Sequence, residues 1–115
     1  MEEYRKVVAY KNYFNEFLNT QSSKIQQKIL FTIRIIKSLK IVPVNYLKHI
    51  EGTTGLYEIR VKFGRKGYRI FCLFDENQLV ILLNGFQKKT KKTPKAEIIK
   101  AMALMKEYYT EKTRT

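Results

Sequence analysis

The chain has 115 residues, of which 44% are hydrophobic, and it contains eight tyrosines and seven phenylalanines. This length and composition exclude a disordered chain and indicate a single packed domain over residues 1–115. Lys and Arg number 23 against ten acidic residues, a formal net charge of +13, which predicts a polyanionic partner such as messenger RNA or the ribosome. A membrane surface is the weaker alternative, because the basic residues do not line one face of an amphipathic helix.

The sequence also bears on the compartment. No apolar run follows a basic start, as it would in a signal peptide. The longest apolar run, residues 79–83, is far below the roughly 18 residues of a membrane span. The single cysteine, Cys72, falls in a strand pattern and cannot form an internal disulfide, which fits a reducing environment. We therefore expect a cytoplasmic protein with no contact with a membrane.

The first half of the chain predicts a strand followed by two antiparallel helices. Residues 4–10 are β-branched and aromatic, as in a strand, and a short helix ends near Gln21. A longer helix opens at Ser23 with a capping box and runs to about Lys40. The segment 46–50 is expected to be irregular. The apolar stripe of the longer helix comprises Ile25, Ile29, Ile33 and Ile36.

The second half predicts mostly sheet. Strands at about 56–63, 67–74 and 79–86 are separated by the turn sequences 64–67 and 75–77. Links this short favour an antiparallel meander.

A helix is expected to close the chain, with Thr93 as its N-cap and Pro94 at its first position. Its apolar stripe would comprise Ile98, Met102, Met105 and Tyr109. The order of elements indicates an α+β domain with an antiparallel central sheet, and with the helices packed on one face of that sheet.

Strand alternation places positive charge across the middle of the predicted sheet. A four-residue loop at 64–67 would pair Lys62 with Arg69, and the next turn would place Asn84 opposite Arg69. The apolar side chains then fill the other face, so the hydrophobic pattern fixes the register. The charged face would carry Glu58, Arg60, Lys62, Arg69, Phe71, Asn84 and Phe86.

Alternating charge is ordinary on a sheet that faces solvent on one side. The alternative interpretation is therefore a solvated surface with no binding function. Two features favour a binding surface. Apolar and aromatic groups lie among the cations, and RNA recognition uses aromatic planes for bases and cations for phosphates. Further basic residues extend the positive field in the flanking loops: Arg65, Lys66, Lys88, Lys89, Lys91 and Lys92.

Three segments resemble a known family: "LKHIEGTTGLYEIRVKF", "KGYRIFCLF" and "VILLNGFQKKTKKTPKAEI". The ordered set G-L-Y-E-I-R, then Y-R, then G-F-x-K-K-T-x-K-T-P is similar to the phage-derived, HigB-like branch of the RelE toxin superfamily. The resemblance spans nearly the whole chain. It implies a microbial-RNase-like α+β fold, and a toxin of a type II toxin–antitoxin system that a helix-turn-helix antitoxin neutralises in an oligomeric complex.

The resemblance also implies an activity. Such toxins enter the ribosomal A site and cleave messenger RNA without a metal, leaving a 2′,3′-cyclic phosphate and a 5′-hydroxyl. The positions that match the family motifs are Arg60, Arg69 and Lys88 or Lys89. Lys62, Arg65 and Lys66 match only in kind, as basic residues on or near the hairpin.

The residues themselves agree with this chemistry, because the planar fork of arginine holds two oxygens of a phosphorane at once. The general base is less evident. Relatives often have His before the G-F pair, where this chain has Asn84, and the lone histidine, His49, lies outside the sheet pattern. Glu58 and Lys62 are the remaining candidates. The alternative function is therefore a non-catalytic binder of ribosomal or messenger RNA with the same fold.

No cofactor is expected from the sequence. One cysteine and one histidine, with few clustered carboxylates, supply no recognisable set of metal ligands. The glycines at 64 and 67 belong to a hairpin turn with no helix after it, unlike a phosphate-binding loop. Cys72 falls on the core face, which favours a packing role over that of a nucleophile.

Overall fold

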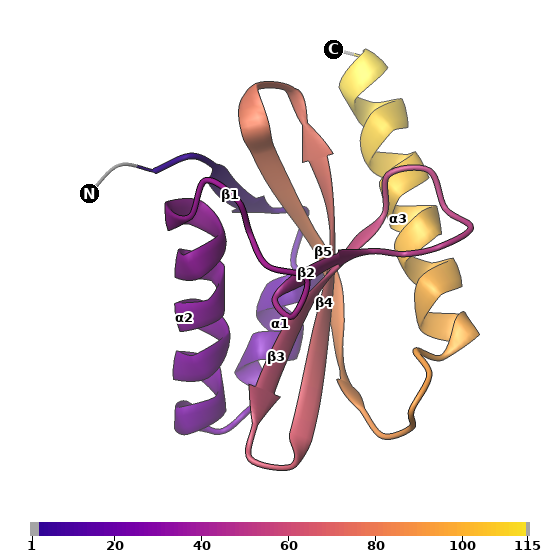
Figure 1. Ribbon diagram of the computed structural model, residues 1–115. Helices are drawn as coiled ribbons and strands as arrows, with labels where there is room; N and C mark the ends of the chain where they lie inside the picture. The colour runs from indigo at the N-terminus through magenta and orange to yellow at the C-terminus, as the bar shows by residue number, and fades with distance from the viewer. Residues whose placement is uncertain (1–2, 115) are drawn as a thin grey trace.

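A five-stranded sheet lies between helices on both of its faces in the computed structural model, which describes residues 3–114 (Figure 1). The strand order is β1-β5-β4-β3-β2. β1 runs parallel to β5, and the remaining neighbours are antiparallel. The elements in chain order are β1 (Lys6–Ala9), α1 (Tyr13–Asn19), α2 (Ser23–Ser38), β2 (Leu47–His49), β3 (Tyr57–Phe63), β4 (Lys66–Asp75), the 3-10 turn η1 (Glu76–Gln78), β5 (Leu79–Lys88) and α3 (Lys95–Arg114).

The predicted α+β class and the meander of β3, β4 and β5 are confirmed, but the helices do not share one face. α1 and α2 cover one side of the sheet and α3 covers the other, as Figure 1 shows. Each side has its own core. Ile59, Ile70 and Cys72 lie in the core under α1 and α2, while Phe71 and Leu73 lie in the core under α3. Where α3 packs, the strands thus carry apolar side chains on both faces. Helices on one face alone would leave the other apolar face exposed to water, so the fold has helices on both.

Helix α2 carries the predicted apolar stripe, with Ile29 and Ile36 fully buried against the sheet. Its N-cap is Ser22, one residue earlier than expected, because the Ser22 hydroxyl accepts the Ile25 N–H at 3.4 Å. At the other end, Arg5 donates to the carbonyls of Ile36, Leu39 and Lys40 at 2.6 to 3.1 Å. A cation at this end also complements the helix dipole.

Helix α3 begins after Pro94, whose carbonyl accepts from the Glu97 N–H at 3.1 Å. Thr93 is not the cap, because its hydroxyl bonds to a side chain of the sheet, as described below. The buried stripe of α3 is also rotated from the predicted one. Ala101 and Leu104 are buried, with Ile98, Met105 and Tyr108 packed beside them, whereas Met102 and Tyr109 are 41% and 40% exposed. No helix within residues 3–114 is both long and apolar enough to cross a bilayer.

The hairpin between β3 and β4 has a shorter turn than expected. Phe63 pairs with Lys66, so Gly64 and Arg65 alone form the turn, and Gly64 takes the positive φ of +62° that glycine adopts readily. Arg60 therefore lies opposite Arg69, in the place predicted for Lys62, which instead pairs with Gly67. Because the shift is two residues, every side chain of the hairpin keeps its predicted face.

Two further differences lie on either side of this hairpin. Residues 47–49, expected to be irregular, form the edge strand β2, in which Lys48 pairs with Glu58. In β5 a bulge opens opposite Phe71, because Ile70 pairs with Gly85 while Cys72 pairs with Leu82. One added residue comes from this bulge and another from the turn Glu76–Gln78, where Asp75 pairs with Leu79, so Phe86 and not Asn84 lies opposite Arg69.

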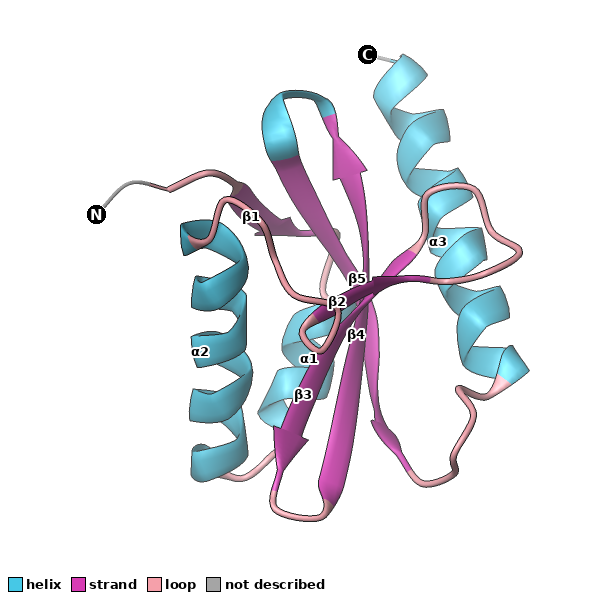
Figure 2. Ribbon diagram, viewed as in Figure 1, coloured by secondary structure: helices cyan, strands magenta, loops and turns pink. Residues whose placement is uncertain are grey.

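The turn between β4 and β5, drawn in Figure 2 as a short cyan segment between two magenta strands, is tied to the end of α3. Asp75 accepts hydrogen bonds from the Tyr108 hydroxyl, from Lys112 Nζ at 2.6 Å and from the Glu76 N–H at 2.7 Å. The bonds from Lys112, Tyr108 and Glu76 lower the pKa of Asp75 from its ordinary value of 3.8 to about 2.

We predict that Asp75→Asn lowers the free energy of unfolding by about 2 kcal/mol at pH 7, since charged hydrogen bonds at this carboxylate are lost. A depressed pKa stabilises the folded state above the unfolded-state value of 3.8, and that contribution is lost as the pH falls through about 2. Urea unfolding at several pH values should therefore show the two proteins converging near pH 2. Glu76→Gln, at the exposed neighbouring position, is the control. A constant difference across this pH range would contradict the assignment.

Candidate RNA-binding and active site

Helix α3 covers only part of its face of the sheet, and the uncovered part carries the basic residues. Cross-strand pairing arranges them in rows. One row runs from Lys62 through Gly67 to Lys88, and the next runs from Arg60 through Arg69 to Phe86. Gly67 has no side chain to fill the space between Lys62 and Lys88. The sheet thus presents cations from three consecutive strands around a hollow.

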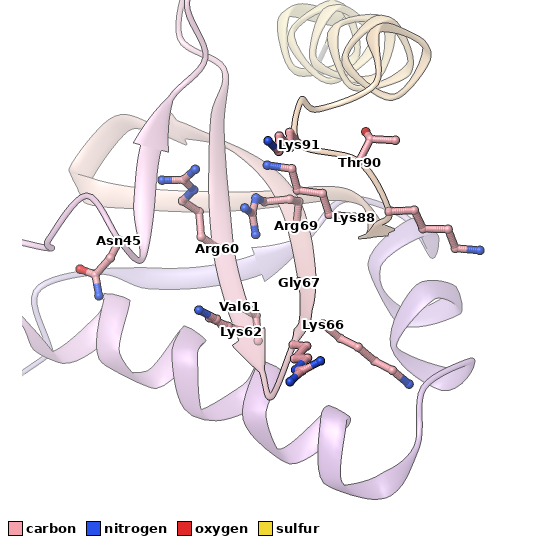
Figure 3. Close-up of a pocket in the computed structure, with 12 residues that line it drawn as sticks. Asn45, Arg60, Val61, Lys62, Lys66, Gly67, Arg69, Lys88, Thr90 and Lys91 are labelled. Atoms are coloured by element: carbon pink, nitrogen blue, oxygen red, sulfur yellow. The ribbon is translucent and has the colours of Figure 1, made fainter.

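This hollow is an open cavity of about 530 Å³ (Figure 3). In Figure 3 the Lys88 side chain extends over the sheet toward Arg69, whereas Lys66 points away from it. The structure brings together eight of the predicted site residues here. The lining residues are Asn45, Arg60, Val61, Lys62, Arg65, Lys66, Gly67, Arg69, Lys88, Lys89, Thr90 and Lys91.

Beside the cavity, the carboxylate of Glu58 lies between two guanidinium groups. Glu58 is only 4% exposed. Its Oε1 lies 3.5 Å from Arg69 Nε, and its Oε2 lies 3.7 Å from Arg60 Nε. The Thr93 hydroxyl donates to Oε1 at 3.2 Å. The carboxylate therefore compensates two neighbouring cations and contacts the loop before α3.

The environment shifts the pKa of two of the cations. Burial is the main cause that lowers the pKa of Arg69; the Glu58 carboxylate opposes this effect and the nearby Arg60 adds to it. The pKa of Lys88 is lowered first by burial and then by repulsion from Arg69, Arg60 and Lys48, again against the attraction of Glu58. The sequence suggested Lys62 as a candidate general base. The structure adds Lys88, whose pKa is affected by Arg69, Arg60 and Lys48.

A second cavity of about 350 Å³ adjoins the first and shares Arg60, Lys88 and Lys91 with it. It contains Lys92, the remaining basic residue predicted from the sequence, together with Lys48 and Thr93. The prediction missed Lys48 because 46–50 had been interpreted as irregular. No alternation marks a strand there, because Leu47 is half-buried whereas Lys48 and His49 are both exposed.

Two residues predicted to bind RNA lie elsewhere. Phe86 is 9% exposed and stacks on the fully buried Phe71 under α3, with ring centroids 5.7 Å apart. Asn84 is 2% exposed, and its Nδ2 lies 3.5 Å from the Glu97 carbonyl and 3.4 Å from Glu97 Oε1. The aromatic groups beside the cations therefore form the surface on which α3 packs, and bases could not stack on them.

The lone histidine and the lone cysteine do not line the first cavity. His49 Nε2 donates a hydrogen bond to the Thr53 carbonyl, 3.0 Å away, and its ring meets the edge of Tyr57. Cys72 is fully buried, as predicted, and burial raises the pKa of its thiol. No group of three or more His, Cys, Asp or Glu side chains within residues 3–114 is arranged to hold a metal ion.

We predict opposite shifts of the Lys88 pKa in two variants. Arg69→Gln removes a repelling charge and should raise this pKa, while Glu58→Gln removes an attracting charge and should lower it further. Titration of the lysine Nζ signals by ¹⁵N NMR measures both shifts. Arg34→Gln, on the exposed side of α2, is the control and should leave Lys88 unchanged. Equal Lys88 titrations in all four proteins would show that these charges do not act on it.

Comparison with known proteins agrees with this geometry. Residues 16–106 match the family described as "Phage derived protein Gp49-like (DUF891)". No curated protein sequence matches the chain. Among solved structures, the chain is similar to one described as an archaeal RelE–RelB complex from Pyrococcus horikoshii OT3, with 19% identity and a TM-score of 0.53. The similarity covers 71% of this chain and 92% of that one.

The family match spans most of the chain, including β3, β4, β5 and the loop before α3, which line the basic cavity, whereas β1 lies outside the match. The structural similarity independently shows the RelE-like fold. This chain therefore belongs to the phage-derived Gp49-like family and has a RelE-like fold.

Proposed function

We propose that this protein is the toxin of a type II toxin–antitoxin system and cleaves messenger RNA in the ribosomal A site. The observation that carries the proposal is the row in which Arg60 lies opposite Arg69, with Lys88 extending toward them in an open cationic cavity. The positive charge of such a cavity complements the negative charge of an RNA backbone. The family and the fold support the same conclusion.

In this proposal cleavage proceeds by attack of the ribose 2′-hydroxyl on the adjacent phosphate. A P–O bond forms to the 2′-oxygen and the bond to the 5′-oxygen breaks, leaving a 2′,3′-cyclic phosphate and a 5′-hydroxyl. Arg60 and Arg69 would stabilise the charge that develops on the phosphate oxygens. Lys88 is the best-placed group for proton transfer, because its lowered pKa brings a neutral amine closer to working pH.

The other basic residues would bind the RNA around this centre. Lys62, Arg65 and Lys66 lie on or near the β3–β4 turn, and Lys89, Lys91 and Lys92 lie in the loop before α3. These side chains would contact phosphates and so add affinity without reading sequence.

The proposed partner besides RNA is an antitoxin with a helix-turn-helix domain, and the complex would be oligomeric and cytoplasmic. The similar solved structure is itself described as a RelE–RelB complex. The net charge of +13 would also speed association with an acidic partner surface. Co-expression with an adjacent antitoxin candidate should rescue growth, and the two proteins should co-purify.

A non-catalytic RNA binder with the same fold is the second candidate. The observation that favours it is Asn84, which stands where relatives often have His and is buried against α3. Induced expression followed by mapping of RNA 5′ ends separates the two functions. New ends within translated codons support the nuclease, growth arrest without new ends supports the binder, and normal growth contradicts both.

Arg69→Ala should lower the rate of RNA cleavage by about 10²–10³-fold, the typical effect of removing one stabiliser of a developing oxyanion. The side chain of Arg69 is 11% exposed, less open than the sequence suggested, so thermal unfolding must accompany the kinetics. Arg34→Ala, an exposed arginine on α2, removes the same charge far from the cavity and should cleave normally. Normal cleavage by folded Arg69→Ala would contradict the proposed active site.

Lys91→Ala with Lys92→Ala should weaken ribosome association without abolishing cleavage. Each lost phosphate contact should reduce the slope of log affinity against log salt by about one unit. The matched control is Lys24→Ala with Arg34→Ala, which removes two exposed charges from α2. Identical slopes for the loop variant and the wild type would place RNA away from this loop.

A further inference from the structure

Glu58 is a buried charged group that the proposed cleavage chemistry does not use. Its side chain is 6% exposed and comes from β3, on the same face as Arg60. Oε1 accepts the hydrogen bond of the Thr93 hydroxyl and lies 3.5 Å from Arg69 Nε, while Oε2 lies 3.7 Å from Arg60 Nε. The two contacts with the arginines are ion pairs and not hydrogen bonds, because both Nε atoms are buried without a hydrogen-bond partner among residues 3–114. Glu58 lines the second cavity but not the first, into which the cations of the proposed active site project.

We propose that Glu58 is a positioning residue, which holds both arginines by their Nε groups and ties the basic loop 89–94 to the sheet. This inference rests on the proposed function for its catalytic consequence. Its structural content, the restraint of two guanidinium groups and one loop by a single carboxylate, can be measured without any cleavage assay.

The geometry explains how the restraint would serve the reaction. A guanidinium that pairs with a carboxylate through Nε keeps N–H donors of its terminal amino groups available for a phosphate. Arg69 is fixed at a second point as well, since its Nη1 donates to the Tyr68 carbonyl at 3.1 Å. Arginines that are already oriented need little reorganisation when charge develops on the phosphate.

The same carboxylate reaches the loop through Thr93. This loop carries Lys89, Lys91 and Lys92, and Thr90 stabilises it internally by donating to the Lys92 carbonyl at 2.7 Å. Thr93 is the last residue before Pro94 and the start of α3, and its hydroxyl bonds to Glu58 at 3.2 Å. One carboxylate thus links the groups proposed for chemistry with those proposed for RNA binding.

The kinetic test is Glu58→Gln in single-turnover cleavage of ribosome-bound RNA. We expect the rate constant of cleavage to fall at least tenfold while the half-saturating concentration stays equal or decreases, because the arginines remain charged but lose their orientation. The cleavage rate of Glu58→Gln should still fall toward acidic pH, because proton transfer by Lys88 needs its neutral amine. A rate that no longer falls at acidic pH would make Glu58 the general base, and an unchanged rate constant would show that Glu58 positions nothing. Either result overturns the proposal. Glu16→Gln, on α1, makes the same change in net charge and is the control.

Exchange of the arginine Nε–H protons with water, measured by NMR, is the second test. In the wild type we expect those of Arg60 and Arg69 to exchange at least tenfold more slowly than that of the exposed Arg34. Equal rates would overturn the proposal even if Glu58→Gln does not fold. If the wild-type protein cleaves no RNA, the proposed function fails, while slow exchange would still support the restraint.

The loop is tested with Thr93→Val, which removes the hydroxyl but keeps the shape of the side chain. Amide hydrogen exchange in residues 89–93 should become several-fold faster, and RNA association several-fold weaker. Thr93→Ser keeps the hydroxyl and should restore both properties. Unchanged exchange in Thr93→Val, or equal defects in the Ser and Val variants, would show that the bond to Glu58 does not hold the loop.

Discussion

The basic surface of this protein depends on the balance of charge in one row of the sheet, where Arg60 lies directly opposite Arg69. Like charges at directly opposed positions repel and destabilise a strand pair. Arg69 is also mostly buried, which adds a cost of desolvation. Glu58 offsets both effects, because its carboxylate lies within 4 Å of each Nε. The sheet can therefore hold these arginines close together although their charges repel each other.

Crowding of this kind also sets how the surface can interact with a ligand. Neighbouring charges act on one another where water is partly excluded, and burial together with repulsion from Arg69 lowers the pKa of Lys88. A single carboxylate cannot neutralise the many cations around the cavity. An incoming phosphate chain would supply the missing negative charge, so the structure is suited to a polyanion that follows the row of cations from one cavity into the next.

Much of this arrangement could be predicted from alternation alone. The apolar residues of β3 and β4 determine which side chains share a face, and a register error of two residues does not change that assignment. The turn length could not be read in the same way, because Gly64 to Gly67 offers several turn residues and only pairing decides which of them enter the strands. The position of Asn84 was also beyond alternation, because this residue lies in a bulge that no periodic pattern marks.

Composition was informative about charge but not about how each charge is used. Phe71 and Phe86 suggested a stacking surface, yet they are apolar because α3 packs on them. Arg5 adds to the net positive charge, but its guanidinium caps the carbonyl end of α2. Both cases depend on contacts between segments far apart in the chain, and these contacts follow from the topology of the whole fold, not from local sequence.

The sheet order has a consequence for the time at which this surface first exists. Arg60, Arg69 and Lys88 come from three consecutive strands, and Lys88 is the last residue of β5. β5 also pairs with β1, from the other end of the chain, so the sheet cannot close before β5 has been synthesised. Before that point the basic residues of β3 and β4 lack Lys88 and the loop that follows β5. The cationic cavity assembles only after the final strand and the loop that follows it have left the ribosome.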